Sequence, residues 1–502
     1  MSKLSRLTRN SLIVAFFFLI DKVFAFVRTG IILRQFSDSV EMLDTFNAAN
    51  NLPDVLFALI SGGALAMAFI PLLTEYLTTR DRAAAWDLFS RVANVAFLVT
   101  GSLAILIAIF AQPIVDAKLG IAPGFGQEQR TLLAELMRLN LIGTLIFSIS
   151  GLVMASLQAN QHFVFPAMAP IMYNIGQIFG AIFLVPIYGI YGLVYGVIIG
   201  ASMHLLIQLP MLFKLGFHWT PSLDLHNTGL IEALKLMAPR LLTMGGIQII
   251  VLARDNLASR LDQVGAVTSL TYGWMIMQVP ETILGTAIAT AMLPTISELA
   301  AWGDWAGFRS TVERAIRVLI ALTVPIAAVM SAGLAPLVRG FVGPDNEALS
   351  ILVTWTTRTY LLILTGYTIQ EIAVRAFYAR KEPMIPLYAV ALRITLFLGI
   401  GYIGLTFFSE IGAPIIAFAE IAVLIEAVIL LIWLSNRLHE PIRVGGAVVK
   451  GFLAAFIGGI IAYAVAVYLP GGAIITALIG MTVGGVIALA VVWSEAKQLL
   501  KL

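Results

Sequence analysis

Three charged residues interrupt the first long apolar run of the sequence. Asp21 and Lys22 are adjacent, and Arg28 follows about two helical turns after Asp21. A charged side chain at the centre of a bilayer costs about 2.5–3.5 kcal/mol, so such residues normally face a protein interior or a water-filled cavity. Lys22 and Arg28 are therefore candidates for attracting an anion. Snorkelling toward a helix end, or internal pairing of Asp21 with Arg28, is the competing interpretation.

Polar residues also begin the second apolar run. Asp44 lies at its start, and Asn47, Asn51 and Asp54 recur at i, i+4 and i+7, which places them along one helical face. Pro53 frees a main-chain carbonyl within that helix. We predict that Asp44, Asn47 and Asn51 order or line a polar cavity. Ordinary capping near the membrane interface is the alternative.

Further charges lie in later apolar runs. Arg254 is followed directly by Asp255 in the seventh run, where it is either a cavity charge or a headgroup contact. Glu420 and Glu426 lie in the twelfth run. These two acids are either a proton or cation site, or buried acids satisfied by their neighbours.

The composition explains why these charges are informative. Of 502 residues, 60% are hydrophobic and 12% are charged, and the mean hydropathy is +0.95. Such a chain lacks the polar residues needed to cover a water-soluble fold. Runs of about 20 apolar residues are long enough to cross a bilayer as helices. The sequence contains fourteen such runs, near 11–34, 46–73, 91–112, 132–157, 163–187, 190–213, 233–257, 266–296, 314–337, 349–374, 384–408, 412–434, 447–469 and 472–494.

We therefore predict an all-α polytopic membrane protein with 14 transmembrane helices. Most Lys and Arg residues between the runs fall on one side if the N-terminus is cytoplasmic. Because cytoplasmic loops carry the excess of basic residues, both termini are predicted to be cytoplasmic.

The first twelve runs contain an internal repeat. A constant offset, shortened slightly after one loop, aligns Gly62 with Gly285, Pro71 with Pro294, Arg91 with Arg314, Pro113 with Pro336, Arg138 with Arg358, and Pro166 with Pro386. We predict two six-helix lobes, 1–220 and 221–440, in a parallel pseudo-two-fold repeat, with two extra C-terminal helices in 441–502. Paired lobes of this kind enclose a cleft that rocking exposes to each side in turn, so the repeat indicates transport.

The last two runs are almost uncharged. Beside a cationic cleft, residues 441–502 form either a groove for a lipid tail or plain lipid-facing helices. The chain has no cysteine, its five histidines are scattered, and HExxH, Walker A and GxSxG patterns are absent. We expect no enzymatic activity, no metal site and no cofactor. A net charge of +3 is too small to indicate nucleic-acid binding.

The segment from Lys22 to Tyr76 resembles the MurJ (MviN) lipid II flippases of the MOP exporter superfamily. The resemblance covers the fourteen-span plan as well as short motifs in both repeats. The motifs are Phe26-Val27-Arg28, Asp44-Thr45-Phe46, Leu52-Pro53-Asp54, Gly63-Ala64, Ala68-Phe69-Ile70-Pro71, Val279-Pro280, Leu284-Gly285 and Leu293-Pro294.

The resemblance implies a flippase that moves lipid II, the undecaprenyl-pyrophosphate-linked peptidoglycan precursor, from the inner to the outer leaflet by alternating access. It implies a bacterial inner-membrane protein with a central cationic cavity and a groove for the undecaprenyl tail. We expect a monomer whose partners are the membrane and lipid II or a related polyprenyl-pyrophosphate glycolipid, with ion coupling left open.

Single positions can be carried over from the family. Arg28 and Asp44 match its functional positions, and Lys22 replaces a typical arginine, keeping the charge without the bidentate fork. The family's basic residues in spans 2 and 8 correspond to Phe57 or its neighbour and to Met275. Arg254 is a candidate to replace the second of these charges.

Three other functions remain. The chain is alternatively a MOP-family exporter of another lipid-linked oligosaccharide, a MATE-type cation-coupled exporter, or a non-transporting membrane scaffold. The residues at Phe57 and Met275 favour the scaffold, whereas the retained Lys22 and Arg28 oppose it.

Overall fold

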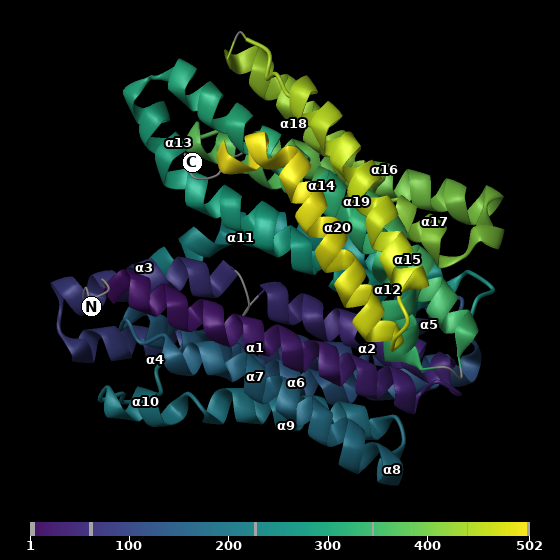
Figure 1. Ribbon diagram of the computed structural model, residues 1–502. Coiled ribbons are helices and arrows are strands. Elements are labelled where there is room, and N and C mark those ends of the chain that lie inside the picture. The colour runs from purple at the N-terminus through teal and green to yellow at the C-terminus, as the bar shows by residue number, and fades with distance from the viewer. Residues whose placement is uncertain are drawn as a thin grey trace. The chain divides into compact units, whose positions relative to one another are not determined.

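The computed structural model describes residues 6–59, 64–224, 228–343, 346–382, 384–438 and 440–498 (Figure 1). Within these ranges all regular secondary structure is helical. The chain divides into two compact units, Met1–Leu252 and Ala253–Leu502. An all-α architecture is thereby confirmed, and each unit has its own packed interior.

Among the described residues, ten α-helices lie wholly within the first unit, and α11 (Thr228–Ser259) begins there and ends in the second. The ten are α1 (Arg6–Gln35), α2 (Val40–Phe57), α3 (Ala64–Thr79), α4 (Arg82–Ile109), α5 (Ala111–Asp116), α6 (Gln127–Ala159), α7 (Val164–Phe179), α8 (Val185–Tyr188), α9 (Tyr191–Leu206) and α10 (Leu209–Lys214). A π-helical turn, Gly180–Leu184, joins α7 to α8.

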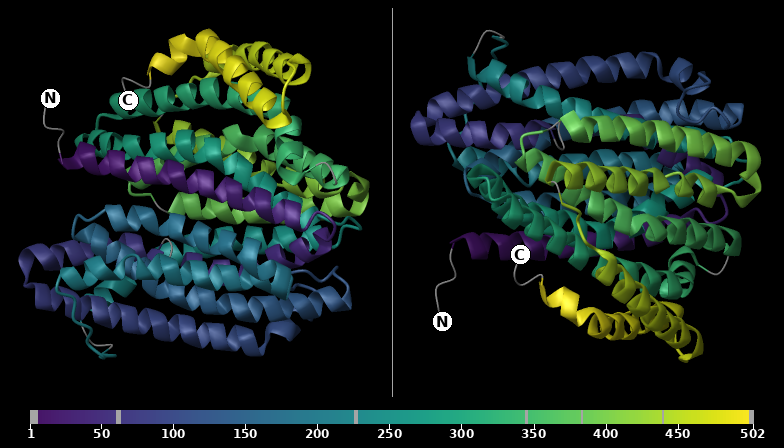
Figure 2. Two further views of the ribbon diagram at one scale, coloured as in Figure 1. Left: turned by 60° about the horizontal axis from the view of Figure 1, so that its bottom comes forward. Right: turned by 90° about the horizontal axis from the view of Figure 1, so that it is seen from above.

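Among the described residues, nine α-helices lie wholly within the second unit. They are α12 (Ala266–Glu281), α13 (Ala287–Trp302), α14 (Trp305–Val342), α15 (Glu347–Ala379), α16 (Met384–Phe407), α17 (Ala413–Phe418), α18 (Ile421–Leu438), α19 (Gly445–Tyr468) and α20 (Ala473–Ala496). A π-helical turn, Thr282–Thr286, joins α12 to α13. The adjacent α19 and α20 pack together and against α14, as both views of Figure 2 show.

Eleven helical segments among the described residues are long and apolar enough to cross a membrane. Together they correspond to eleven of the fourteen predicted runs. The other three runs correspond to α1, to α2 with α3, and to α11. The protein is therefore a multi-pass membrane protein.

Close helix packing in the first unit depends on glycine. A Cβ atom on Gly176 of α7 would lie 2.3 Å from the Cα of Gly200 on α9, and one on Gly180 would lie 2.5 Å from the Cα of Gly196. Only glycine allows two backbones to approach this closely, and small residues are the common device for helix association in membranes. The glycines of α9 therefore serve close packing against α7.

Positions aligned by the sequence repeat share local geometry. Asp81 and Asp304 are the N-caps of α4 and α14, and each accepts a hydrogen bond from the amide three residues on, at 2.7 and 2.9 Å. Gln161 and Lys381 follow α6 and α15, and both have φ of 60°. A positive φ is uncommon for residues other than glycine, so its recurrence at aligned positions indicates a structural repeat.

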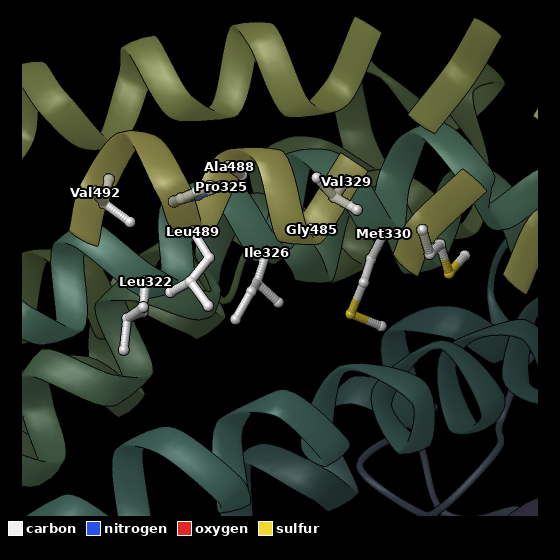
Figure 3. A pocket seen from close by; sticks show the side chains of 10 residues that line it. Leu322, Pro325, Ile326, Val329, Met330, Gly485, Ala488, Leu489 and Val492 are labelled. Atoms are coloured by element: carbon white, nitrogen blue, oxygen red, sulfur yellow. The ribbon is translucent and has the colours of Figure 1, made fainter. Parts of the chain in front are cut away.

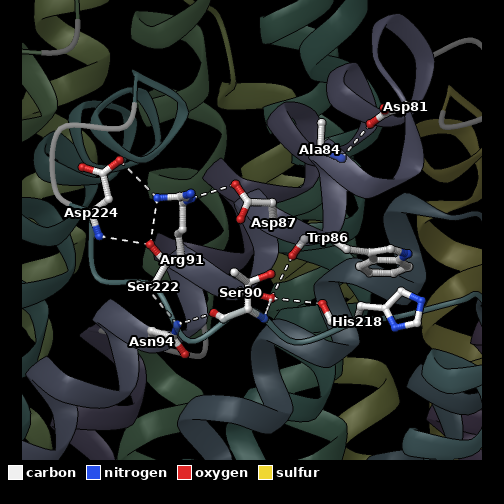
Figure 4. Close-up of polar contacts among 11 residues, drawn as sticks. Asp81, Ala84, Trp86, Asp87, Ser90, Arg91, Asn94, His218, Ser222 and Asp224 are labelled. Atoms are coloured by element: carbon white, nitrogen blue, oxygen red, sulfur yellow. Dashed lines mark hydrogen bonds and ion pairs between the residues drawn. The ribbon is translucent and has the colours of Figure 1, made fainter.

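The segment that leads from α10 toward α11 is fastened to α4 (Figure 4). Arg91 donates to Asp87 at 2.7 Å, to the Ser222 hydroxyl at 2.9 Å and to Asp224 at 3.2 Å. The Asn94 amide donates to the main-chain oxygen of Ser222 at 3.0 Å. These bonds fix the chain just before α11 begins.

Candidate functional site

The lysine predicted on α1 is incompletely neutralised. Lys22 Nζ lies 3.9 Å from Asp21 Oδ2, and the lysine side chain is 42% exposed. The other oxygen of Asp21 accepts a hydrogen bond of 2.8 Å from the Asn174 side chain on α7. Because Asp21 is shared between Lys22 and Asn174, it fastens α1 to α7 as well as offsetting the lysine charge.

Arg28 lies on the same helix and has a different environment. Its Nε atom is buried and has no hydrogen-bond partner within the described part of the chain. Its charge interacts electrostatically with Asp21, Asp54 and Tyr173. The ion pair of Asp21 is with Lys22. Arg28 therefore retains donor capacity that a ligand oxygen would satisfy.

Asp54 and Tyr173 line a pocket of about 320 Å³ inside the first unit. The pocket is surrounded by α2, α6, α7 and α9. Its remaining lining residues are Asn50, Pro53, Phe57, Asn140, Gly143, Thr144, Phe147, Met154, Pro170, Val197 and His204. A mixed wall of amide, carboxylate, hydroxyl and aromatic groups suits a small polar ligand with an apolar face.

Two polar residues of the pocket wall, His204 and Asn140, differ in their hydrogen bonding. The Nδ1 atom of His204 lies 2.6 Å from the Ser150 hydroxyl, which also accepts a hydrogen bond of 3.0 Å from Gln208. These contacts fix the orientation of the imidazole ring. Asn140 is 2% exposed, and neither atom of its amide has a hydrogen-bond partner among the described residues. An unpaired buried amide is costly, so Asn140 is the group in this wall most in need of a partner.

The structure defines which face of α2 lines the pocket. Asn50 and Asp54 lie on it, whereas Asp44 and Asn51 are buried, with 4% and 6% exposure. Asn47 is half-buried. Asp44, Asn47 and Asn51 each interact with other groups of the protein. They support the helix that carries the pocket wall, and their contact with substrate stays a prediction.

Sequence reasoning did not single out Asn140, Tyr173 and His204. Each is a polar residue in an otherwise apolar run, which is the signal that identified Lys22 and Arg28. Asn140 lies on α6, Tyr173 on α7 and His204 on α9, and only the packing of these helices shows that the three side chains share one pocket.

Arg254 lies on the part of α11 that belongs to the second unit. Its Nε donates to Asp255 Oδ1 at 2.8 Å, and the two side chains are 10% and 0% exposed. The two side chains form a buried ion pair, which is neither the cavity charge nor the headgroup contact considered from the sequence. The substrate contact predicted for Arg254 is not tested by this arrangement and stays a prediction.

An apolar groove of about 300 Å³ lies between α14 and α20 (Figure 3). Leu322, Ile326 and Leu489 project to the same side of the two helices. The remaining lining residues are Pro325, Val329, Met330, Met481, Gly485, Ala488 and Val492. The lining consists of hydrocarbon and thioether groups, so the groove suits an aliphatic chain.

One end of this groove carries positive charge. Glu495, one helical turn after Val492, is 2% exposed and accepts hydrogen bonds from Arg317 at 3.1 and 3.2 Å and from Lys450 at 2.9 Å. Two cations therefore surround one carboxylate. These three side chains together carry one net positive charge near the Val492 end of the groove.

Comparison with known proteins identifies the family. Residues 38–491 match the family model described as Lipid II flippase MurJ. The chain belongs to the MurJ family of lipid II flippases. The resemblance inferred from its sequence motifs is therefore confirmed.

Individual relatives match most of the chain. The lipid II flippase MurJ of Burkholderia cenocepacia is 28% identical over 425 residues, 81% of each chain. The probable lipid II flippase MurJ of Buchnera aphidicola, from the pea-aphid strain, is 26% identical over 377 residues, 74% of this chain and 73% of the relative.

Solved structures share the fold. A lipid II flippase MurJ in an inward closed conformation superimposes with a TM-score of 0.78 at 21% identity, covering 97% of this chain and all of that one. An inward-facing MATE transporter of the MOP superfamily gives 0.70 at 15% identity, covering 84% and 94%. The fold is thus common to MurJ and MATE proteins.

Proposed function

We propose that the protein moves lipid II from the inner to the outer leaflet of the bacterial cytoplasmic membrane by alternating access. The family match over residues 38–491 carries this proposal. The curated relatives that match the chain over most of its length are named as lipid II flippases. The proposed activity is transport of a lipid across the bilayer, without covalent chemistry.

The proposed topology has fourteen transmembrane helices with both termini in the cytoplasm. Each repeat supplies six helices in the same orientation, and α19 and α20 are additional. The matched N-caps Asp81 and Asp304 support the repeat. The distribution of Lys and Arg supports the orientation.

The pyrophosphate of the substrate is proposed to bind Lys22 and Arg28. Lys22 is partly exposed, and Arg28 has a donor without a protein partner in the described ranges. Charge-assisted hydrogen bonds from guanidinium to phosphate are strong and directional. Arg254 is proposed to contribute a further positive charge, which Asp255 partly offsets through the bond from Arg254 Nε.

The undecaprenyl tail is proposed to lie in the groove between α14 and α20. Its apolar lining supports this role, and Gly485 keeps the wall open because no described atom lies within 4 Å of a Cβ built there. The cations Arg317 and Lys450 at one end suit a phosphate-bearing headgroup. The proposed groove therefore uses α14 as well as the C-terminal helices.

A different lipid-linked saccharide is the second candidate substrate. Phe57 lines the polar pocket and packs against Phe147, with ring centroids 5.2 Å apart. The family resemblance places a basic residue at or beside this position. A more apolar wall there favours a headgroup with less negative charge or more apolar surface.

Complementation tests the proposed function. The protein is expressed in a bacterium depleted of its own lipid II flippase, and its level in the membrane is measured. We expect it to restore growth and cell shape. Continued lysis, with the protein correctly inserted at the level of a working flippase, would contradict lipid II transport and favour another saccharide.

A further inference from the structure

A buried network of charges lies in the second unit, away from the groove. Arg393 of α16 donates to Glu420 Oε2 and to the Tyr367 hydroxyl, each at 2.9 Å. Tyr367 in turn donates to Glu420 Oε2 at 2.6 Å. One oxygen of Glu420 thus receives two donors, and the side chains of Arg393 and Glu420 are 7% and 6% exposed. Glu420 Oε2 and Arg393 Nη2 are therefore paired, whereas the buried Nε of Arg393 has no hydrogen-bond partner among the described residues.

Within the described part of the chain, Glu426 is the acid of this network that has no ion pair at hydrogen-bond distance. Its side chain is fully buried, and neither carboxylate oxygen has a hydrogen-bond partner among the described residues. The nearest cation is Arg393, whose Nη1 lies 3.8 Å from Glu426 Oε2. The side-chain amide of Gln370 on α15 lies beside it. Glu426 is also near the middle of the Ala413–Leu438 membrane segment, where an ionised carboxylate is most costly.

The charges around Glu426 do not balance if it is ionised. Arg393 is matched by Glu420, and the neighbouring Arg254 is matched by Asp255. The ionised Glu426 adds one negative charge without a counter-charge of its own. The other titratable groups facing this cluster are on α15: Tyr360, Tyr367 and Glu371, the last of which is paired with Arg375.

A proton neutralises Glu426 better than a metal ion does. Hard metal cations need several oxygen ligands at once. No group of three or more His, Cys, Asp or Glu residues among the described residues could hold a metal ion. The guanidinium of Arg393 already lies between Glu420 and Glu426, and a second cation there would be repelled.

We propose that Glu426 is a proton-binding site that is loaded in this conformation and is emptied during the transport cycle. Release breaks the carboxyl O–H bond and transfers the proton to water. The carboxylate left behind attracts Arg393 away from Glu420, so loading and emptying favour different arrangements of α16 and α18. The role in transport rests on the proposed function, whereas the binding of a proton does not.

Infrared spectroscopy of the purified full-length protein tests the site without any substrate. We expect a protonated-carboxyl band at neutral pH that shifts in heavy water and disappears at alkaline pH. Glu426→Gln should abolish this band. Glu410→Gln, which removes an exposed carboxylate of the same unit, should leave it in place. Glu420→Gln should weaken it, because Arg393 then lacks its carboxylate partner and can pair with an ionised Glu426. If Glu426→Gln does not fold, Glu426→Asp should move the band and the pH at which it is lost.

Two results would overturn the proposal. One is a band that is absent from the wild type or unchanged in Glu426→Gln and Glu426→Asp. The other is loss of the band on adding sodium ions at constant pH, because a metal cation would then be the ligand. A wild type that shows the band but fails complementation would leave the proton site intact and contradict only the transported substrate.

Discussion

Arg138 Nε donates a hydrogen bond of 2.9 Å to the main-chain oxygen of Ala108. In the second repeat, Arg358 Nε donates to the main-chain oxygen of Ser331 at 3.0 Å. Ala108 and Ser331 are aligned by the same repeat that aligns the two arginines. Each bond ties the fourth helix of a repeat to the third, so the paired arginines have a structural role.

Removing one of these arginines should weaken the fold. We expect Arg358→Gln to lower the free energy of unfolding by about 1–2 kcal/mol, because it loses the bond to Ser331 and the contact of the guanidinium with the Trp355 ring. Arg339→Gln, which removes an exposed ion pair, should cost about 0–1 kcal/mol. Thermal unfolding of the two purified variants measures the difference, and equal losses would contradict the assigned role.

Arg28 should be needed for transport but not for folding. Arg28→Ala removes the charge and a donor that has no protein partner in the described part of the chain, so lipid II transport should be lost at normal protein level. Arg28→Lys should retain part of the activity, because lysine keeps the positive charge but cannot form the two parallel hydrogen bonds of a guanidinium. Growth of the flippase-depleted strain measures both. Full growth with Arg28→Ala would contradict a role for Arg28 in binding the substrate.

Filling the apolar groove should weaken lipid binding. Gly485 lines the groove and has open space beside it in the described structure, so Gly485→Phe projects a ring into the path of an aliphatic chain. Gly446→Phe places the same ring at an exposed position at the start of α19. Native mass spectrometry with added polyprenyl pyrophosphate should show less bound lipid for Gly485→Phe only. Equal binding by both variants would contradict a tail site in this groove.

The contact of α7 with α9 should not tolerate a single methyl group. A Cβ on Gly176 meets the backbone of Gly200, so Gly176→Ala should cost about 1–3 kcal/mol. Gly399→Ala meets no described atom within 4 Å and should be neutral or stabilising by about 0.5–1 kcal/mol. Their midpoints of thermal unfolding are expected to move in opposite directions. A tolerated Gly176→Ala would show that the two backbones can separate.

Much of the fold follows from the sequence alone. Runs of apolar residues predicted the helical segments because hydrocarbon excludes unpaired backbone groups. The repeat was detectable because glycine, proline and arginine at aligned positions perform local tasks that few other residues can perform. The number of fourteen membrane crossings stays a prediction, because the described residues contain eleven candidate spans.

The site was less predictable. Asn47, Asn50, Asn51 and Asp54 share one side of α2, so periodicity could not decide that Asn50 and Asp54 reach the pocket whereas Asn47 and Asn51 do not. The side chains of the pocket wall on α6, α7 and α9 come together through tertiary packing. For Arg254, the sequence showed the neighbouring Asp255 but not whether the two side chains meet.

Reconstitution tests the central claim most directly. The purified protein is placed in lipid vesicles that contain fluorescent lipid II, and the lipid accessible from outside is followed with a membrane-impermeant quencher or a modifying enzyme. Lipid II should exchange between leaflets with the wild-type protein and remain in place with Arg28→Ala. If the wild-type protein, correctly folded in the vesicles, leaves lipid II as immobile as in protein-free vesicles, the proposed flippase activity is contradicted.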